Sequence, residues 1–140
     1  MMPDKLKMTV TISFFLLFTF QLLAPGNTML VVVDSQPVEP YRQLIQAIGM
    51  VETGKDTMAY NPIENATGYF QIRLIRLEDF NVRTGSNYTQ SDLFNYEISE
   101  KIFLYYASLI GPYDFEQIAR NWNGSGPLTT YYWEQVKKLL

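Results

Sequence analysis

The chain has 140 residues, a formal net charge of -3, 47% hydrophobic and 15% aromatic residues, and neither cysteine nor histidine. This length suits one domain, the apolar content is typical of a globular protein, and the acidic balance argues against a nucleic-acid-binding surface. The missing residue types exclude disulfide frameworks, cysteine nucleophiles, Ser-His-Asp triads and imidazole metal ligands. Any chemistry must therefore rest on carboxylates, hydroxyls and amides.

The first 24 residues predict an exported protein. Lys5 and Lys7 precede an apolar run, residues 8–24, which is typical of a secretory signal peptide and is also long enough for a membrane anchor. A proline directly after this run makes a poor cleavage site, so signal and anchor both stay open, with a buried helix as the plainer alternative. We expect a domain that is periplasmic or anchored to the envelope membrane, in contact with that membrane if the segment is retained.

Residues 25–40 are predicted to form a linker, because proline, glycine, asparagine and serine punctuate them. A valine-rich run within them, residues 29–33, could instead be a small strand or continue the membrane-associated segment. The folded domain is then expected over residues 41–140.

A helix that ends near Glu52 opens this domain. Its apolar face is marked by four residues at helical spacing, Leu44, Ile45, Ile48 and Val51. A carboxylate in the last turn faces the negative end of the helix dipole, at a cost of about 0.3–1 kcal/mol, and natural sequences tolerate such a conflict most readily at functional sites. The plainer interpretation is a solvated glutamate before a glycine that ends the helix.

A polar loop, residues 53–67, follows and holds Asp56 and Glu64, the acids nearest to Glu52 in sequence. A second helix is predicted over residues 74–82. Thr89 or Ser91 is expected to cap a third helix. The predicted apolar side of this third helix comprises Ile98, Ile102, Tyr105, Tyr106 and Leu109.

The remaining pattern predicts two more helices. Gly111-Pro112 stops the third helix, Asp114 is expected to cap a short one over residues 115–122, and Thr129 or Thr130 is expected to start a last one that runs to residue 140. The fold class is therefore all-α, with at most a minor β-hairpin in the loop after Glu52.

Three short motifs occur within this helical pattern: Glu52-Thr53-Gly54, Gly68-Tyr69-Phe70-Gln71-Ile72 and Asn121-Trp122-Asn123-Gly124. In order and spacing they resemble the Glu-Ser-Gly, Gly-Leu-Met-Gln-Ile and Ala-Tyr-Asn-Ala-Gly motifs of soluble lytic transglycosylases and the related goose-type lysozymes. The resemblance covers about residues 41–136. It implies a small lysozyme-like helical domain.

The resemblance also implies a reaction. Glu52 would protonate the β-1,4 glycosidic oxygen between N-acetylmuramic acid and N-acetylglucosamine in peptidoglycan, and would then act as base to draw in the C6 hydroxyl. The product would be a 1,6-anhydromuramic end, formed with a single carboxylate and without a cofactor or a metal ion. The implied partners are glycan strands and, for so small a domain, an envelope-spanning secretion or conjugation machinery, with plain wall turnover as the alternative.

Seven further residues are implied to bind the substrate, six of them within the motifs and the last by its resemblance to a C-terminal tyrosine of the family: Thr53, Gly68, Tyr69, Gln71, Trp122, Asn123 and Tyr132. Thr53 keeps the hydroxyl of the usual serine, whereas Trp122 replaces a tyrosine and loses its hydroxyl. The aromatic residues could equally be ordinary core residues, and Asn123 could be a helix-end or turn residue.

Two other functions stay open at this point. A hydrolytic muramidase would use Asp56 or Glu64 to position a water molecule. A non-catalytic peptidoglycan-binding module of a secretion or conjugation assembly would use the same scaffold without chemistry.

Overall fold

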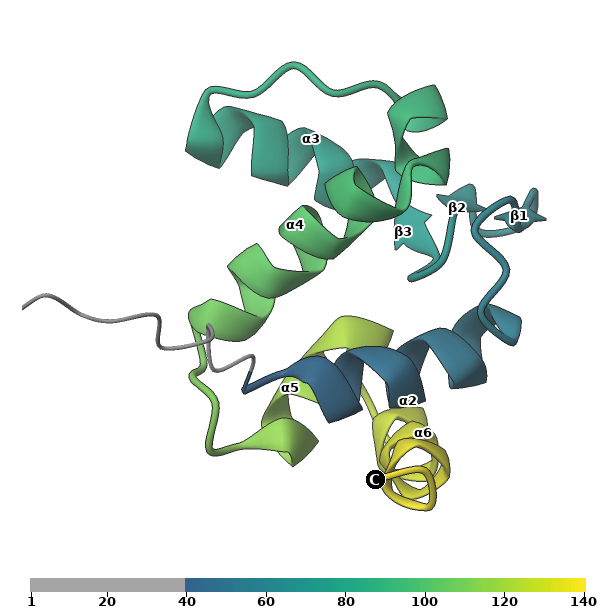
Figure 1. Ribbon diagram of the computed structural model, residues 1–140, viewed down its shortest axis with the longest axis vertical. Helices are drawn as coiled ribbons and strands as arrows, with labels where there is room; N and C mark the ends of the chain where they lie inside the picture. The colour runs from purple at the N-terminus through teal and green to yellow at the C-terminus, as the bar shows by residue number, and fades with distance from the viewer. Residues whose placement is uncertain (1–39) are drawn as a thin grey trace, which may run out of the picture. The chain divides into compact units, whose positions relative to one another are not determined.

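The computed structural model describes residues 40–140, and the predictions of a signal or anchor and of a linker lie outside the described residues but for Pro40 (Figure 1). The described elements are α2 (Arg42–Thr53), β1 (Tyr60–Asn61), β2 (Ala66–Thr67), β3 (Ile72–Arg73), α3 (Leu74–Thr84), the 3₁₀ turn η1 (Gln90–Phe94), α4 (Tyr96–Ser108), α5 (Phe115–Asn123) and α6 (Leu128–Lys137). Among these helices, none is both long and apolar enough to cross a membrane.

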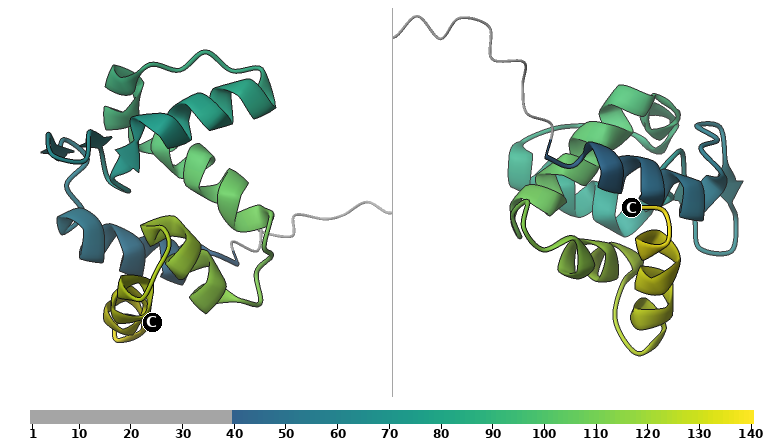
Figure 2. Two further views of the ribbon diagram at one scale, coloured as in Figure 1. Left: turned by 180° about the vertical axis from the view of Figure 1, so that it is seen from behind. Right: turned by 60° about the horizontal axis from the view of Figure 1, so that its bottom comes forward.

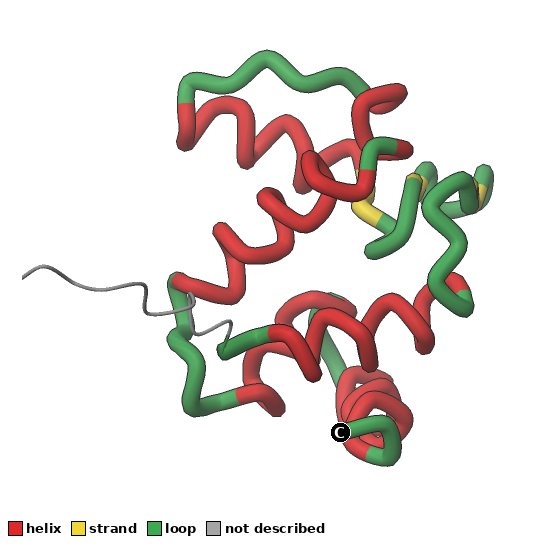
Figure 3. Tube along the Cα trace, in the orientation of Figure 1, coloured by secondary structure: helices red, strands yellow, loops and turns green. Residues whose placement is uncertain are grey.

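The prediction of a mostly helical domain is confirmed, and the predicted minor hairpin is a three-stranded sheet. The strands, drawn in yellow in Figure 3, lie in the order β1-β2-β3 and pair antiparallel. Thr67 lies opposite both Tyr60 and Ile72. A tight turn after Gly68, closed by a 3.0 Å hydrogen bond from the Gln71 N–H to the Gly68 carbonyl, returns the chain alongside β2 and adds the third strand.

The first helix ends as its sequence predicts. Gly54 adopts a left-handed conformation with φ of 63°, and its N–H donates to the Met50 carbonyl at 3.0 Å. A glycine reaches this conformation at little cost, so the helix stops there and leaves Glu52 in its last turn. The predicted apolar residues Leu44, Ile45 and Ile48 are buried.

The start of α4 differs from the prediction. Thr89 caps the 3₁₀ turn η1, while the side chain of Asn95 caps α4 by accepting hydrogen bonds from two backbone N–H groups. Of the predicted apolar side of α4, Ile102 is buried and Ile98, Tyr105 and Tyr106 are partly buried and pack against the core, whereas Leu109 is 61% exposed. The other buried residues of α4 are Ser99, Phe103 and Ala107.

The ends of two other helices also need correction. α3 continues to Thr84 and not only to residue 82, and α6 begins at Leu128, so that Thr129 lies inside it. Pro127 precedes α6 with φ of -69°, which is already a helical value, and therefore starts the helix earlier than a threonine cap would. The predicted cap of α5 is confirmed, because the Asp114 carboxylate accepts from the Gln117 N–H at 2.8 Å.

The helices lie in two groups within the described part of the chain. α2, α5 and α6 lie together on one side, and α3 with η1 lies on the other, with the small sheet at one end (Figures 1 and 2). The core between them is aromatic, since Phe70 stacks on Phe103 at a centroid distance of 4.8 Å and meets Trp122 edge to face at 6.2 Å. The aromatic contacts join three segments, which are the Gly68–Ile72 turn, α4 and the last turn of α5. These segments lie near the C-terminal end of α2, where Glu52 is.

Candidate active site

A cleft of about 280 Å³ opens where α2 ends, and we call it the Glu52 cleft. Its lining residues are Val51, Glu52, Asn61, Glu64, Gln71, Arg73, Arg76, Trp122, Asn123 and Tyr132. They come from α2, the sheet region, α3, α5 and α6. The fold therefore brings together five of the eight predicted site residues, from segments far apart in the sequence.

Glu52 is the central ionisable group of this cleft. Burial raises the pKa of its carboxyl to about 7. Three groups oppose that rise: a hydrogen bond from the Tyr132 hydroxyl to Oε1 at 2.7 Å, and the charges of Arg73 and Arg76. The nearby carboxylate of Glu64 adds to the rise. A carboxyl with this pKa both holds and releases a proton near neutral pH, as a group that acts as acid and base requires.

Tyr132 is a buried residue of α6 whose position in the cleft agrees with the prediction. Only 8% of its surface is exposed, and burial together with the charge of Glu52 raises the pKa of its hydroxyl. The hydroxyl therefore stays protonated and acts as a donor to Glu52.

Arg73 and Glu64 form an ion pair in the cleft. The sequence pointed to Glu64 as an acid near Glu52 but not to Arg73 as its partner. The Arg73 guanidinium donates to Glu64 Oε2 from Nη2 at 2.7 Å and from Nε at 3.0 Å, and its Nη1 lies 3.5 Å from the Asn123 carbonyl. Both side chains are more than a third exposed, so the pair is solvent-screened and contributes little to stability. Its effect is on the electrostatics of the cleft.

Arg76 is a second basic residue that the sequence analysis missed. Its guanidinium donates to the carbonyls of Trp122 at 2.9 Å and Asn121 at 3.1 Å, and lies 4.2 Å from the centre of the Trp122 ring. Burial lowers the pKa of this group from its ordinary value. Arg76 thus satisfies carbonyls at the end of α5 and holds that end against α3. The spacing of Arg73 and Arg76, three residues apart at a helix start directly after Gln71, is a signal that could have found them.

Gln71 has an unusual backbone conformation, with φ of 48°. Its side-chain nitrogen donates to the carbonyls of Gly68 at 3.1 Å and Ala59 at 3.4 Å. Both neighbours are acceptors, so the amide nitrogen must face them and the amide oxygen must face away. The residue therefore fixes the turn after β2 and keeps an acceptor for a ligand of the cleft.

Trp122 is both a core residue and part of the cleft lining. It is 5% exposed, and its indole N–H donates to the Phe70 carbonyl at 3.0 Å. The alternative of ordinary core packing is therefore confirmed for most of this ring. Asn123 is the last residue of α5, before Gly124, and also lines the cleft.

The other three predicted substrate-binding residues, Thr53, Gly68 and Tyr69, are not among the residues that line the cleft. The Thr53 hydroxyl lies 3.2 Å from each of the Gly49 and Tyr69 carbonyls, so it ties α2 to the turn. Gly68 has φ of 76°, and a Cβ there would collide with the backbone carbonyl of Leu93. The Tyr69 ring packs directly over Gly49. These residues hold the motif in place from outside the lining of the cleft.

The two acids considered as partners of Glu52 lie in different places. Asp56 accepts a hydrogen bond from the Met58 N–H at 2.8 Å within its own loop and does not line the cleft. Glu64 lines the cleft, but Arg73 binds its carboxylate.

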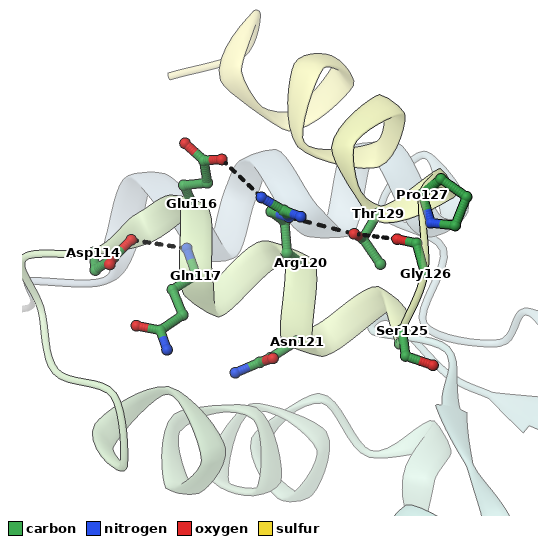
Figure 4. A pocket seen from close by; sticks show the side chains of 10 residues that line it. Asp114, Glu116, Gln117, Arg120, Asn121, Ser125, Gly126, Pro127 and Thr129 are labelled. Atoms are coloured by element: carbon green, nitrogen blue, oxygen red, sulfur yellow. Dashed lines mark hydrogen bonds and ion pairs between the residues drawn. The ribbon is translucent and has the colours of Figure 1, made fainter.

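A larger hollow of about 690 Å³ runs along α5 and the turn that leads into α6, and we call it the α5–α6 hollow (Figure 4). It shares no lining residue with the Glu52 cleft. Its side chains are polar, and Arg120 at its centre bonds Glu116 at 3.2 Å and the Thr129 hydroxyl at 3.3 Å. It contains no carboxyl comparable to that of Glu52, so the Glu52 cleft is the better candidate for chemistry.

Comparisons of the chain with protein-family models, with curated proteins and with solved structures found no match. The functional assignment therefore depends on the geometry of the cleft and on the motifs within it.

Proposed function

We propose that this chain is a peptidoglycan lytic transglycosylase with a lysozyme-like fold, and that Glu52 is its one acid and base. The observation that carries the proposal is the state of Glu52: a largely buried carboxyl with a pKa of about 7, bonded to Tyr132, in a cleft where parts of all three motifs meet. The reaction takes place on the cell wall, so the proposal includes export to the periplasm or the envelope.

The reaction begins with the protonated carboxyl. Tyr132 donates to Oε1, which leaves the acidic proton on Oε2, where it can pass to the glycosidic oxygen as the C1–O bond breaks. The carboxylate that forms is stabilised by the Tyr132 hydroxyl and by the positive charges of Arg73 and Arg76.

The same carboxylate then acts as base. It takes the proton of the C6 hydroxyl of the muramic residue while that oxygen attacks C1, which closes the 1,6-anhydro ring and restores the protonated Glu52. One proton leaves Glu52 and one returns, so the cycle balances without water.

The arrangement of the other acids favours this reaction over hydrolysis. A hydrolytic enzyme needs a second carboxylate that is free to hold a water molecule or to bond C1. In the Glu52 cleft the second carboxylate is Glu64, and Arg73 holds it through two hydrogen bonds. Glu64 nevertheless lines the cleft, so a muramidase is the second candidate.

Mass spectrometry of the soluble products after digestion of purified sacculi tests the proposal. The unmodified protein should release muropeptides with 1,6-anhydromuramic ends, and Glu52→Gln should lower this release about 10²–10⁴-fold or more. Reducing ends, together with a large loss in Glu64→Gln, would assign a muramidase. Absence of cleavage together with glycan binding would assign a non-catalytic wall-binding module, such as a part of a secretion or conjugation machinery.

A further inference from the structure

The α5–α6 hollow lies directly beside the Glu52 cleft. Trp122 and Asn123 line the cleft, and the next residues along the chain, Gly124 and Ser125, line the hollow. A Cβ atom at Gly124 would lie 3.7 Å from Nη1 of Arg73, which is a cleft residue. The turn at Asn123–Gly124 therefore borders both, and a branched polymer bound in the cleft can reach the hollow by crossing this turn.

The chemistry of the hollow differs from that of a sugar site. Sugar rings usually bind against flat aromatic side chains, and the residues that line the hollow include none. They offer charge and amides instead. Asp114 and Glu116 lie at one end of α5, Arg120 lies further along it beside Thr129, and the side chains of Gln117 and Asn121 extend on the side of α5 away from α6 (Figure 4).

This combination suits a short peptide that carries both an amine and carboxylates. Side-chain amides pair with peptide groups. Arg120 and Glu116 bond each other at 3.2 Å in an exposed ion pair, which can exchange its partners for the carboxylate and the amine of a ligand. The Asp114 carboxylate caps α5 through one oxygen, and its other oxygen can accept from the same amine. The volume of about 690 Å³ also lies within the range of about 300–1,000 Å³ that is usual for sites of small ligands.

We propose that the α5–α6 hollow binds the peptide stem on the muramic residue next to the cleaved bond. This inference rests on the proposed function, because the stem is part of that substrate. α5 has nine residues and is about 13 Å long, which an extended peptide of about four residues matches. A stem that enters at Gly124 and runs toward the start of α5 brings the amine of its third residue, a diamino acid, to Asp114 and Glu116.

A double variant, Asp114→Asn with Glu116→Gln, tests the inference. Asparagine caps a helix as well as aspartate does, so α5 keeps its cap while both negative charges are lost. The matched control is Glu97→Gln with Glu134→Gln, which removes two charges from exposed helical positions outside the hollow. Glu97 lies in the first turn of α4, as Glu116 lies in the first turn of α5.

Backbone amide NMR of the full chain is recorded during titration with the tripeptide L-alanyl-D-glutamyl-meso-diaminopimelate. The expected result is a set of shifts confined to residues 114–129, with an affinity that falls at least about threefold in the double variant and stays unchanged in the control. Shifts of residues 114–129 that arise from a chitooligosaccharide and not from the tripeptide would overturn the inference in favour of a glycan site, and no shifts from either would overturn it outright.

The titration needs no cleavage, so it separates the two proposals. If the protein cuts both native sacculi and sacculi stripped of peptides, at equal rates and without tripeptide shifts, the proposed function stands and this inference fails. If the tripeptide binds as described and no sacculus is cut, the hollow is a peptide site and the proposed reaction fails.

Discussion

The Tyr132 hydroxyl on α6 donates a 2.7 Å hydrogen bond to Oε1 of Glu52 in the last turn of α2, across 80 positions of sequence. The bond stabilises the ionised carboxyl, whereas burial favours the protonated one. The balance of these two effects holds the pKa of Glu52 near neutral pH.

Tyr132→Phe should raise the pKa of Glu52 above about 7, because the burial remains and the hydrogen bond that lowers the pKa is lost. NMR titration of the ¹³C-labelled Glu52 carboxyl measures this value. Tyr131→Phe is the matched control, since Tyr131 is the exposed neighbour on the same helix. A lower pKa in Tyr132→Phe would contradict the role given to the hydroxyl.

Glu64→Gln and Arg73→Gln should shift the pKa of Glu52 in opposite directions. The charge of Glu64 raises this pKa and the charge of Arg73 lowers it, so the first variant should lower it and the second should raise it. The pH profile of glycan release should move in the same directions. If both variants shifted the pKa of Glu52 in the same direction by the same amount, the ion pair would act by holding the shape of the cleft and not through its charges.

Glu52 should make the protein less stable as the pH rises. Its folded pKa of about 7 exceeds the ordinary value of 4.5, so the folded state binds the proton more tightly than the unfolded state. The stabilisation is complete below pH 4.5 and is lost as the pH rises through 7, and the change in unfolding free energy is about 3 kcal/mol.

Urea unfolding of the protein and of Glu52→Gln at pH 4 and pH 8.5 measures this dependence, because glutamine does not titrate. The unfolding free energy of Glu52→Gln minus that of the unmodified protein should be larger at pH 8.5 than at pH 4. An equal pH dependence in both proteins would show that Glu52 is not the buried titrating group.

Gly68→Ala should destabilise the fold more than Gly85→Ala. Both glycines have a left-handed backbone, with φ of 76° and 69°, and an alanine there costs about 1–2 kcal/mol. A Cβ at Gly68 also collides with the Leu93 carbonyl, whereas a Cβ at Gly85 meets no atom within 4 Å. Urea unfolding should therefore show a further loss of about 1–3 kcal/mol for Gly68→Ala. Equal losses would mean that the backbone of η1 moves away without cost.

The order of the helices and the place of Glu52 could be predicted from the sequence, because periodicity, caps and helix-ending glycines are local signals. Asp114 and Gly54 act as their residue types indicate. The start of α4 was predicted wrongly, because Thr89 caps the 3₁₀ turn η1 and Asn95 caps α4 itself.

The candidate site was predictable only in part. Motif order pointed to Glu52 and Gln71, and a further resemblance pointed to Tyr132, but the spacing of these residues does not say which side chains meet across the cleft. The ion pair of Arg73 with Glu64 depends on the three-stranded sheet, which brings β3 back beside the loop after β1. The packing of the Tyr69 ring against α2 depends on Gly49, because any side chain at that position would occupy the space of the ring.

The contact between α2 and α6 has a consequence for the folding of the chain. Contacts across a long sequence separation form late, because a large loop must close before they repay its entropy. Until α6 docks, Glu52 lacks the hydrogen bond from Tyr132 and the burial that α6 contributes, which act on its pKa in opposite directions. Under the proposed mechanism, the acid and base of the reaction is therefore assembled only when α6 packs on α2.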